Sequence, residues 1–505
     1  MKGKSIIILT CFFLAVNTAL MAQMKRVVVN NTANVSKKNQ RTIPPSNIIS
    51  SCTADTIILT TQAQIDNFST NNPTCTDPKY LFIDGTGASP AITNLAGLST
   101  INQVLNKLKI SNTSITNLSG LNNLTLIGDT LELTDNLLIT EAELFNLQQL
   151  GAIVFNNLPL LTSIDGLSNN TDSIGSIFID STALTNLNGL GGIARITNGG
   201  FHGLWIANTP LPDLSSLSVL SFIQGYISLD NMTSLTSIGL NNLTHAYGFL
   251  FSNLPNLTGI AGLSYQLTNT NISTFWIINT GLTNLSGLDS LTGSSNFYIW
   301  NNPDLTSLHG LENLTGNING GISIWNNNAL ADISALSNIT SIDDGTLEFH
   351  SNNSLTNLTG VGNITTIGRG LWINNNDNLD SLGDLNNNLV IQNTGNIDSV
   401  RIIDNDQLAL CSFAPLCNYL SIDGRAEIDN NATGCSSISE ITTSCNNNCP
   451  AGSEKTWNGQ NSNNWNDPDN WTPAGIPGTC TKVTIPPYGD VPNTPLASDN
   501  ITIGG

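Results

Sequence analysis

The chain has 505 residues, and its 36 Asp and Glu residues outnumber its 16 Lys and Arg residues, which gives a formal net charge of −20 at pH 7. Residues 1–50 hold seven of the cations and no acidic residue, so residues 51–505 carry 9 − 36 = −27. A body of this charge lacks the cationic surface that nucleic acid or anionic lipid requires, and we expect neither as a partner.

The first 22 residues have the layout of a secretory signal peptide. Lys2 and Lys4 precede an apolar run over 6–20, which ends just before Ala22. That run is shorter than a membrane span and has a basic flank at its amino end. We therefore predict a signal peptide over 1–22, a flexible basic segment over 23–50, no membrane insertion, and a protein that is secreted or held at the cell surface.

Eight cysteines remain once Cys11 is removed with the signal peptide, and they lie toward both ends of the body. An even number in an exported chain indicates disulfides, and the paired Cys-x-x-Cys spacing of zinc sites is absent, so no metal or cofactor is predicted. Cys52 and Cys75 are expected to pair within an N-terminal cap over 51–91. The other six are expected to form disulfides whose pairing the sequence leaves open: Cys411, Cys417, Cys435, Cys445, Cys449 and Cys480.

A phrase of the form Leu-Thr-Asn-Leu-x-Gly-Leu recurs between residues 92 and 407, with starts 22 to 27 residues apart. A second phrase, apolar-x-apolar-x-Asn, precedes it, as in 204–208 and 371–375. Alternation with period two predicts a strand with one buried face. Because one coil cannot bury its apolar stripe alone, the coils must stack. The sequence therefore predicts an all-β fold, a parallel β-solenoid of about 13 or more coils.

Glycine and asparagine recur at fixed places in the repeats. The Gly of the first phrase is expected to permit a tight corner. The Asn that ends each strand is expected to satisfy backbone groups at a buried corner that no regular ladder reaches. These residues are Asn112, Asn157, Asn208, Asn231, Asn253, Asn279, Asn301, Asn326 and Asn375.

The pattern resembles leucine-rich repeats and, more closely, the receptor L-domain type of right-handed β-helix, over about residues 85–445. The resemblance implies a right-handed solenoid over 92–407. The segment 416–445 is similar to the cap that closes such solenoids in surface proteins of Gram-negative bacteria, which implies a Cys-rich cap over 408–449. A cap is needed because the last coil otherwise exposes its core and strand edge.

The composition changes from Trp457 onward. The pairs Trp457-Asn458, Asn464-Trp465 and Asn470-Trp471 resemble an "NW" module of bacterial adhesin-like proteins. The resemblance implies that residues 450–505 begin such a β module. Because the sequence stops where another strand would begin, we expect it to be a fragment of a longer protein.

The register of the repeats assigns all five tryptophans of the repeat region to outward-facing positions. Exposed aromatic rings on a rigid sheet offer a large contact area to sugar rings or protein partners. A strip of seven residues is therefore predicted to bind a glycan or protein: Trp205, Trp276, Tyr298, Trp300, Trp325, His350 and Trp372. Two alternatives remain: a ladder that only stabilises the sheet, or a strip that a downstream segment covers.

Catalysis is not expected. The four histidines fall in different coils without a Ser-His-Asp order, and the acids and arginines do not gather in one groove. We therefore predict an exported, adhesin-like binding protein that is not an enzyme. The alternatives are a structural spacer that carries a missing C-terminal domain and, less favoured, a polysaccharide-degrading β-helix enzyme. The oligomeric state is not indicated.

Overall fold

The computed structural model describes residues 50–495 except 170–171, 198–201, 264–270, 273, 295, 393–399, 423, 448–453, 466, 475–476, 478–481 and 488. The predicted signal peptide and all but the last residue of the basic segment lie outside the described residues, as do Cys449 and Cys480. The chain divides into two compact units, Met1–Leu282 with Ser286–Leu291, and Thr283–Leu285 with Thr292–Gly505.

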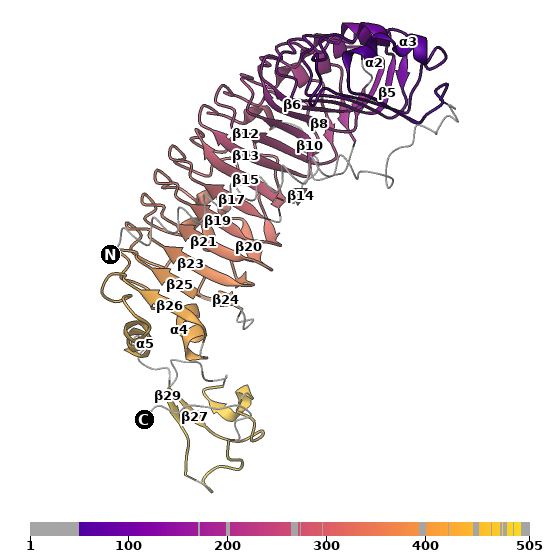
Figure 1. Ribbon diagram of the computed structural model, residues 1–505. Helices are drawn as coiled ribbons and strands as arrows, with labels where there is room; N and C mark the ends of the chain where they lie inside the picture. The colour runs from indigo at the N-terminus through magenta and orange to yellow at the C-terminus, as the bar shows by residue number, and fades with distance from the viewer. Residues whose placement is uncertain are drawn as a thin grey trace. The chain divides into compact units, whose positions relative to one another are not determined.

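The first unit is built on a parallel sheet in which each coil contributes one strand (Figure 1). Each strand pairs in parallel with the next one of the series. The strands are β1 (Thr56–Leu59), β2 (Tyr80–Asp84), β4 (Lys107–Ser111), β5 (Leu126–Thr134), β6 (Gln149–Leu158), β8 (Ile177–Thr182), β10 (His202–Ala207), β12 (Tyr226–Asp230), β13 (Gly248–Leu254) and β15 (Thr274–Thr280). The parallel pairing thus begins at β1, upstream of the first repeat phrase.

Shorter strands follow the main strands of the first unit. The strand β3 (Gln103–Val104) pairs with β5. A separate parallel sheet contains β7 (Ser173–Ile174), β9 (Arg195–Ile196) and β11 (Phe222–Ile223), and β14 (Asn271–Ile272) is the last short strand of the unit. Several coils of the unit therefore form short parallel pairings outside the main sheet.

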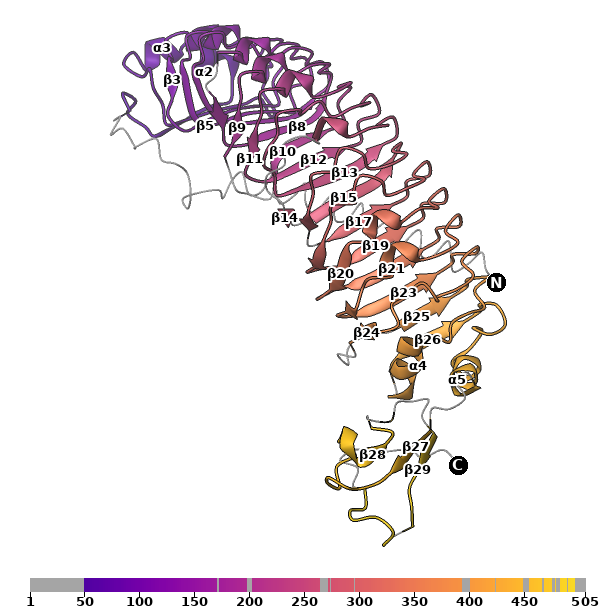
Figure 2. The same ribbon diagram turned by 180° about the vertical axis from the view of Figure 1, so that it is seen from behind.

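The second unit repeats this plan, and Figure 2 shows its main strands side by side from behind. The series is β17 (Phe297–Trp300), β19 (Ile322–Trp325), β21 (Thr346–His350), β23 (Gly370–Asn374), β25 (Val400–Ile403) and β26 (Ala426–Asp429). Its short strands are β16 (Gly293–Ser294), β18 (Gly316–Ile318), β20 (Ile339–Ile342), β22 (Thr366–Ile367) and β24 (Val390–Ile391). Both units confirm the predicted all-β, parallel β-solenoid.

The leucines of the repeat phrase fill the interior of each coil. Leu305, Leu308 and Leu311, for example, are all fully buried. The end of the phrase forms a short 3-10 helix in many coils, because closely spaced apolar residues there turn the chain inward. These helices are η1 (Ala96–Leu98), η2 (Ser119–Leu121), η3 (Asp165–Leu167), η4 (Asn188–Leu190), η5 (Ser215–Leu217), η6 (Ala261–Leu263), η7 (Ser334–Leu336) and η8 (Thr359–Val361).

The glycine of the phrase is required mainly by the close approach of neighbouring coils. A Cβ on Gly189 would overlap the carbonyl oxygen of Ile164 in the preceding coil, and Gly360 meets Ile333 in the same way. Neither glycine has a positive φ. The tight-corner expectation holds at Gly287 and Gly310, whose φ values are +118° and +108°. Steric fit between coils is therefore the more general reason for this residue.

The asparagine at the end of each strand does not occupy the buried corner, so that prediction was wrong by one residue. Asn208, Asn301 and Asn326 have φ values of +48°, +56° and +53°, and their side chains are exposed or half-buried. The left-handed conformation, which Asn tolerates better than most residues, turns the following residue inward. That following residue is buried, as Thr209 and Asn302 show.

In the second unit these following residues form a buried asparagine ladder: Asn302, Asn327, Asn352, Asn376 and Asn405, all fully buried. The Oδ1 of Asn352 accepts the main-chain N–H of Asn327 at 3.1 Å, and the Nδ2 of Asn327 donates to the carbonyl oxygen of Ile299 at 2.8 Å. The same pattern repeats in the next rungs. Each amide thus satisfies backbone groups that the sheet leaves unpaired.

Disulfides and short helices lie at both ends of the solenoid. The helices α2 (Gln62–Asp66) and α3 (Phe68–Asn71) belong to the first coil, and the Cys52–Cys75 disulfide confirms the predicted pair. At the other end, α4 (Ala414–Ser421) and α5 (Ile438–Asn447) contain Cys417 and Cys445, which are bonded to each other. A further disulfide joins Cys411 to Cys435. The structure thus decides two pairings that the sequence left open.

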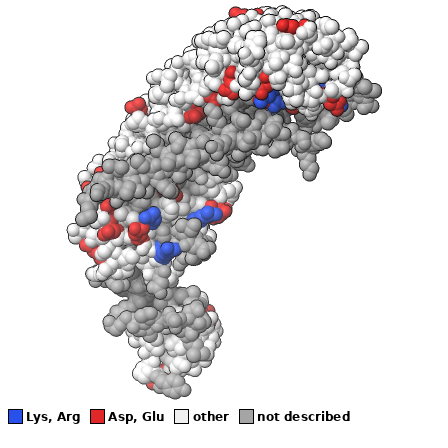
Figure 3. Space-filling view, in the orientation of Figure 1, with Lys and Arg blue, Asp and Glu red and all other residues white. Residues whose placement is uncertain are grey.

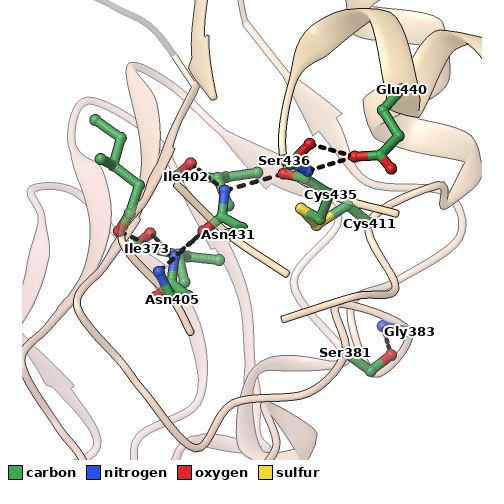
Figure 4. The surroundings of a disulfide bond; sticks show 11 residues. Ile373, Ser381, Gly383, Ile402, Asn405, Cys411, Asn431, Cys435, Ser436 and Glu440 are labelled. Atoms are coloured by element: carbon green, nitrogen blue, oxygen red, sulfur yellow. Dashed lines mark hydrogen bonds between the residues drawn. A yellow bond between two sulfur atoms is a disulfide. The ribbon is translucent and has the colours of Figure 1, made fainter. Parts of the chain in front are cut away.

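The asparagine ladder ends at the Cys411–Cys435 disulfide (Figure 4). Asn405 donates its main-chain N–H to the Oδ1 of Asn431 at 3.0 Å. The Nδ2 of Asn431 donates to the carbonyl oxygens of Ile402 at 2.7 Å and of Cys435 at 3.1 Å. A continuous chain of hydrogen bonds therefore joins the last rungs to Cys435.

A small three-stranded sheet follows, formed by β27 (Glu454–Trp457), β28 (Trp471–Thr472) and β29 (Lys482–Thr484). Trp457 and Trp471 are buried and lie edge to face, with ring centroids 5.0 Å apart. Just before β28, the 3-10 helix η9 (Pro468–Asn470) places the buried Asn470, whose Oδ1 accepts two main-chain N–H groups at 2.9 Å each. The membership of this segment in the "NW" family stays a prediction.

Within the described part of the chain, no helix is long and apolar enough to cross a membrane.

Candidate binding site

The seven residues of the predicted strip lie on main strands of both units. Trp205 is on β10 and Trp276 on β15, in the first unit. The other five are in the second unit, on β17, β19, β21 and β23: Tyr298, Trp300, Trp325, His350 and Trp372. The strand pairing agrees with the predicted register, because Trp300 lies opposite Trp325, Trp325 opposite His350, and Glu348 opposite Trp372.

The first unit gives its two tryptophans different surroundings. Trp205 is only 2% exposed, which differs from the exposed position expected for it. Its ring stacks on Phe178 with centroids 6.0 Å apart, in a cluster with Val154 and Ala207. Trp276 lies opposite Leu250 and is half-buried. We therefore build the candidate site from the five residues of the second unit.

The rings of the second unit form one continuous row, which we call the aromatic row: Tyr298, Trp300, Trp325 and His350. Trp300 and Trp325 are stacked, with centroids 5.4 Å apart and planes 27° apart. His350 follows at 4.8 Å from Trp325, and Tyr298 meets Trp300 edge to face at 5.4 Å. All four side chains are half-buried. The pairing of parallel strands, about 4.8 Å apart, sets this stacking.

A carboxylate at the centre of the sheet orients both indoles. Glu348 Oε2 accepts a hydrogen bond from Trp325 Nε1 at 3.1 Å and another from Ser323 Oγ at 2.9 Å. Ser323 Oγ in turn accepts the Nε1–H of Trp300 at 3.0 Å. Thr346 Oγ1 donates to the other carboxylate oxygen of Glu348 at 2.5 Å. These hydrogen bonds hold both indole N–H groups against the sheet and restrict the orientation of the two rings.

No role was assigned to Glu348 in the sequence analysis. The signal was present in the register, because Ser323 is directly opposite Glu348 and Trp325 is its diagonal neighbour. The hydrogen bonds themselves depend on side-chain torsions that a register does not specify.

The ionisable groups of the site titrate away from their ordinary ranges. Burial raises the pKa of Glu348, and the hydrogen bonds from Thr346, Ser323 and Trp325 partly oppose that effect. Burial, together with the positive charge of Arg401, lowers the pKa of His350 to about 4. The imidazole is therefore neutral at pH 7, so His350 contributes an uncharged ring to the row.

Trp372 lies at the far side of Glu348 and is flanked by a cation. The guanidinium carbon of Arg401, on the next strand, is 5.6 Å from the Trp372 ring centroid. Arg401 also makes a salt bridge with Glu427 at 2.8 Å. The charge of Arg401 is thus shared between an indole face and a carboxylate.

Two further histidines among the described residues have partners away from the aromatic row. His309 pairs with the exposed Glu312 at 2.6 Å, and His245 stacks on Phe222 at 4.6 Å. Among the described residues, no group of three or more His, Cys, Asp or Glu side chains could hold a metal ion. Most of the described surface in Figure 3 carries no charged side chain. The arrangement on β17–β23 presents the half-buried rings of the aromatic row and of Trp372.

Comparisons with known proteins leave the family open. No model of a protein family matches the sequence, and no curated protein matches it. Among solved structures, the chain is similar to one described as "Functional domain of InlJ from Listeria monocytogenes includes a cysteine ladder". That match has 17% sequence identity and a TM-score of 0.27, and it covers 55% of this chain and 69% of the other. Similarity at this level supports no inference about the function of this chain.

Proposed function

We propose that the protein is an exported binding protein that uses the aromatic row and Trp372 to attach to a glycan or protein on another surface. The observation that carries the proposal is the stack of Trp300, Trp325 and His350. Glu348 accepts the indole N–H of Trp325, and Ser323 accepts that of Trp300. A pre-oriented aromatic surface loses little conformational entropy on binding, and aromatic anchors dominate binding energy in many interfaces.

Export is supported by the disulfides at both ends of the solenoid, since disulfides persist in oxidising compartments outside the cytosol. The layout of residues 1–22 supports the same proposal. Mass spectrometry of the mature chain is expected to find an amino terminus close to Gln23. An uncleaved chain that starts at Met1 would argue against export by this route.

The site is tested by replacing both stacked indoles, Trp300→Ala and Trp325→Ala. We expect binding to glycan arrays and to intact cells to fall at least tenfold, because loss of two aromatic anchors costs well over 1.4 kcal/mol of binding free energy. Phe145→Ala is the control, because Phe145 is an exposed aromatic residue (52%) away from the row. Unchanged binding by a folded double variant would overturn the site.

The second candidate function is a spacer that holds a further domain away from the cell. The separate three-stranded sheet that follows the last disulfide-bonded segment supports this alternative. A spacer predicts that the double tryptophan variant keeps all binding and that activity resides in a different domain. The same experiment therefore distinguishes the two functions.

A further inference from the structure

Four adjacent strands in the middle of the first unit are buried on both faces. Leu204 and Ile206 of β10 belong to the core, yet the outward-facing Trp205 and Ala207 are only 2% and 1% exposed. The strands β8, β12 and β13 show the same burial over at least three consecutive residues. A strand of a parallel sheet that is buried on both faces has material packed on both. The outward face of β8–β13 therefore requires a cover.

Neighbouring side chains on the sheet do not explain this burial. In the second unit, Tyr298, Trp300 and Trp325 have equally large neighbours and remain half-buried. Phe82 on β2, in the first unit, is half-buried as well. The buried apolar residues on the outward side of β6–β13 form what we call the central face: Val154, Phe178, Trp205, Ala207 and Leu250.

We propose that the amino-terminal segment 23–49 of the same chain lies over the central face. Val27, Val28 and Val29 supply the apolar contacts to the rings of Phe178 and Trp205. This docked position replaces the flexibility that the sequence alone led us to expect for the segment. The inference goes beyond the proposed function, because it concerns the first unit and the proposed binding site is in the second.

The segment is long enough to reach this face. Val29 precedes Thr56, the first residue of β1, by 56 − 29 = 27 residues, which span up to about 90 Å when extended. Trp205 lies six strand pairings from β1, which is about 29 Å along the sheet. The connection is therefore longer than the distance that it must cover.

The charges of the segment and of the sheet beneath it are complementary. Residues 23–49 contain five Lys and Arg residues and no Asp or Glu. Asp180 and Asp230 lie on the outward side of the sheet, on the two strands that flank Ala207. Burial and the negative charge of Asp180 both raise the pKa of Asp230. A cation of the segment placed over the two carboxylates would offset their repulsion.

Acrylamide quenching of Trp205 fluorescence in the full chain tests the cover. The signal of Trp205 is the difference between the wild type and Trp205→Phe. We expect this signal to be shielded from acrylamide in the wild type and to lose its shielding in the triple variant Val27→Ser, Val28→Ser, Val29→Ser. Val219→Ser is the matched control and should keep the shielding, because Val219 is an exposed valine (45%) of the same unit.

A chain that lacks residues 23–49 provides the second measurement, with circular dichroism to establish that it folds. Trp205 is expected to be accessible in it, and a synthetic peptide of residues 23–49 is expected to restore the shielding. The triple-serine peptide should bind at least about tenfold more weakly, because burial of three valines contributes more than the 1.4 kcal/mol that a tenfold change represents. A peptide of the same composition in scrambled order should restore nothing.

Three results would overturn the inference. The first is a Trp205 that acrylamide quenches freely in the wild type, which would show an open face. The second is shielding that persists in the triple variant or in the folded, truncated chain. The third is shielding that is lost on dilution, with a molar mass of two chains by light scattering, which would assign the cover to a second copy. If the truncated chain does not fold, the triple variant decides.

Discussion

Two residue types, asparagine and glycine, recur at positions where neighbouring coils meet. The buried asparagines form hydrogen bonds with backbone groups that the sheet leaves unpaired, and the glycines of the repeat phrase allow adjacent coils to approach closely. Both act between coils, so each residue matters only because its neighbours repeat along the sequence.

Asn327→Ala tests the asparagine ladder. The change leaves the carbonyl oxygen of Ile299 and the main-chain N–H of Asn302 without their partners in a fully buried position. We expect the free energy of unfolding to fall by about 3 kcal/mol, because each buried unpaired group costs roughly 1–3 kcal/mol. Urea denaturation measures the loss, and Asn353→Ala is the control. A change as small as that of the control would show that the ladder does not stabilise the fold.

Gly189→Ala tests the close approach of coils. The added methyl would overlap the carbonyl oxygen of Ile164, so the coils must separate, and we expect a loss of about 1–3 kcal/mol. Gly259→Ala in the same unit is the matched control, because nothing lies within 4 Å of a Cβ there. Thermal unfolding compares the two variants. Equal melting temperatures would contradict the steric explanation.

At the scale of elements, neighbouring strands are held by pairs of side chains that face each other across rungs. Strands β4 and β5 are held by oppositely charged side chains, because Lys107 and Lys109 on β4 form salt bridges with Glu132 on β5. Burial alone would raise the pKa of Glu132, but the hydrogen bonds and charges of the two lysines hold it below its usual range.

This lowered pKa predicts how stability changes with pH. Because the folded state binds a proton at Glu132 less readily than the unfolded state does, the pair stabilises the fold above about pH 4.5. That contribution is lost as the pH falls through the lowered pKa of the folded state. We expect the difference in unfolding free energy between wild type and Glu132→Gln to shrink from pH 7 to pH 3. Asn353→Ala, at an exposed residue whose side chain does not ionise, should show no such trend. A constant difference for Glu132 would contradict the assignment.

The elements also show where sequence reasoning succeeded. Strand register was predicted correctly for β17–β25 because a period of two leaves only one way to bury the apolar face. The buried asparagine was misplaced by one residue, since the left-handed residue after each strand breaks the alternation on which the register depends. Neither Asn301 nor Asn302 indicates by its type which of the two faces inward.

At the scale of the whole molecule, the sequence by itself determined that the chain is a stack of parallel coils. Repeated apolar stripes can be buried only against copies of themselves, and that requirement does not depend on any single contact. It also determined which columns hold the tryptophans and that Cys52 pairs with Cys75. Only the tertiary structure decided that Trp205 is buried, that Glu348 orients Trp300 and Trp325, and that Cys411 pairs with Cys435. These features depend on side-chain torsions and on distances between coils, which a repeat pattern does not encode.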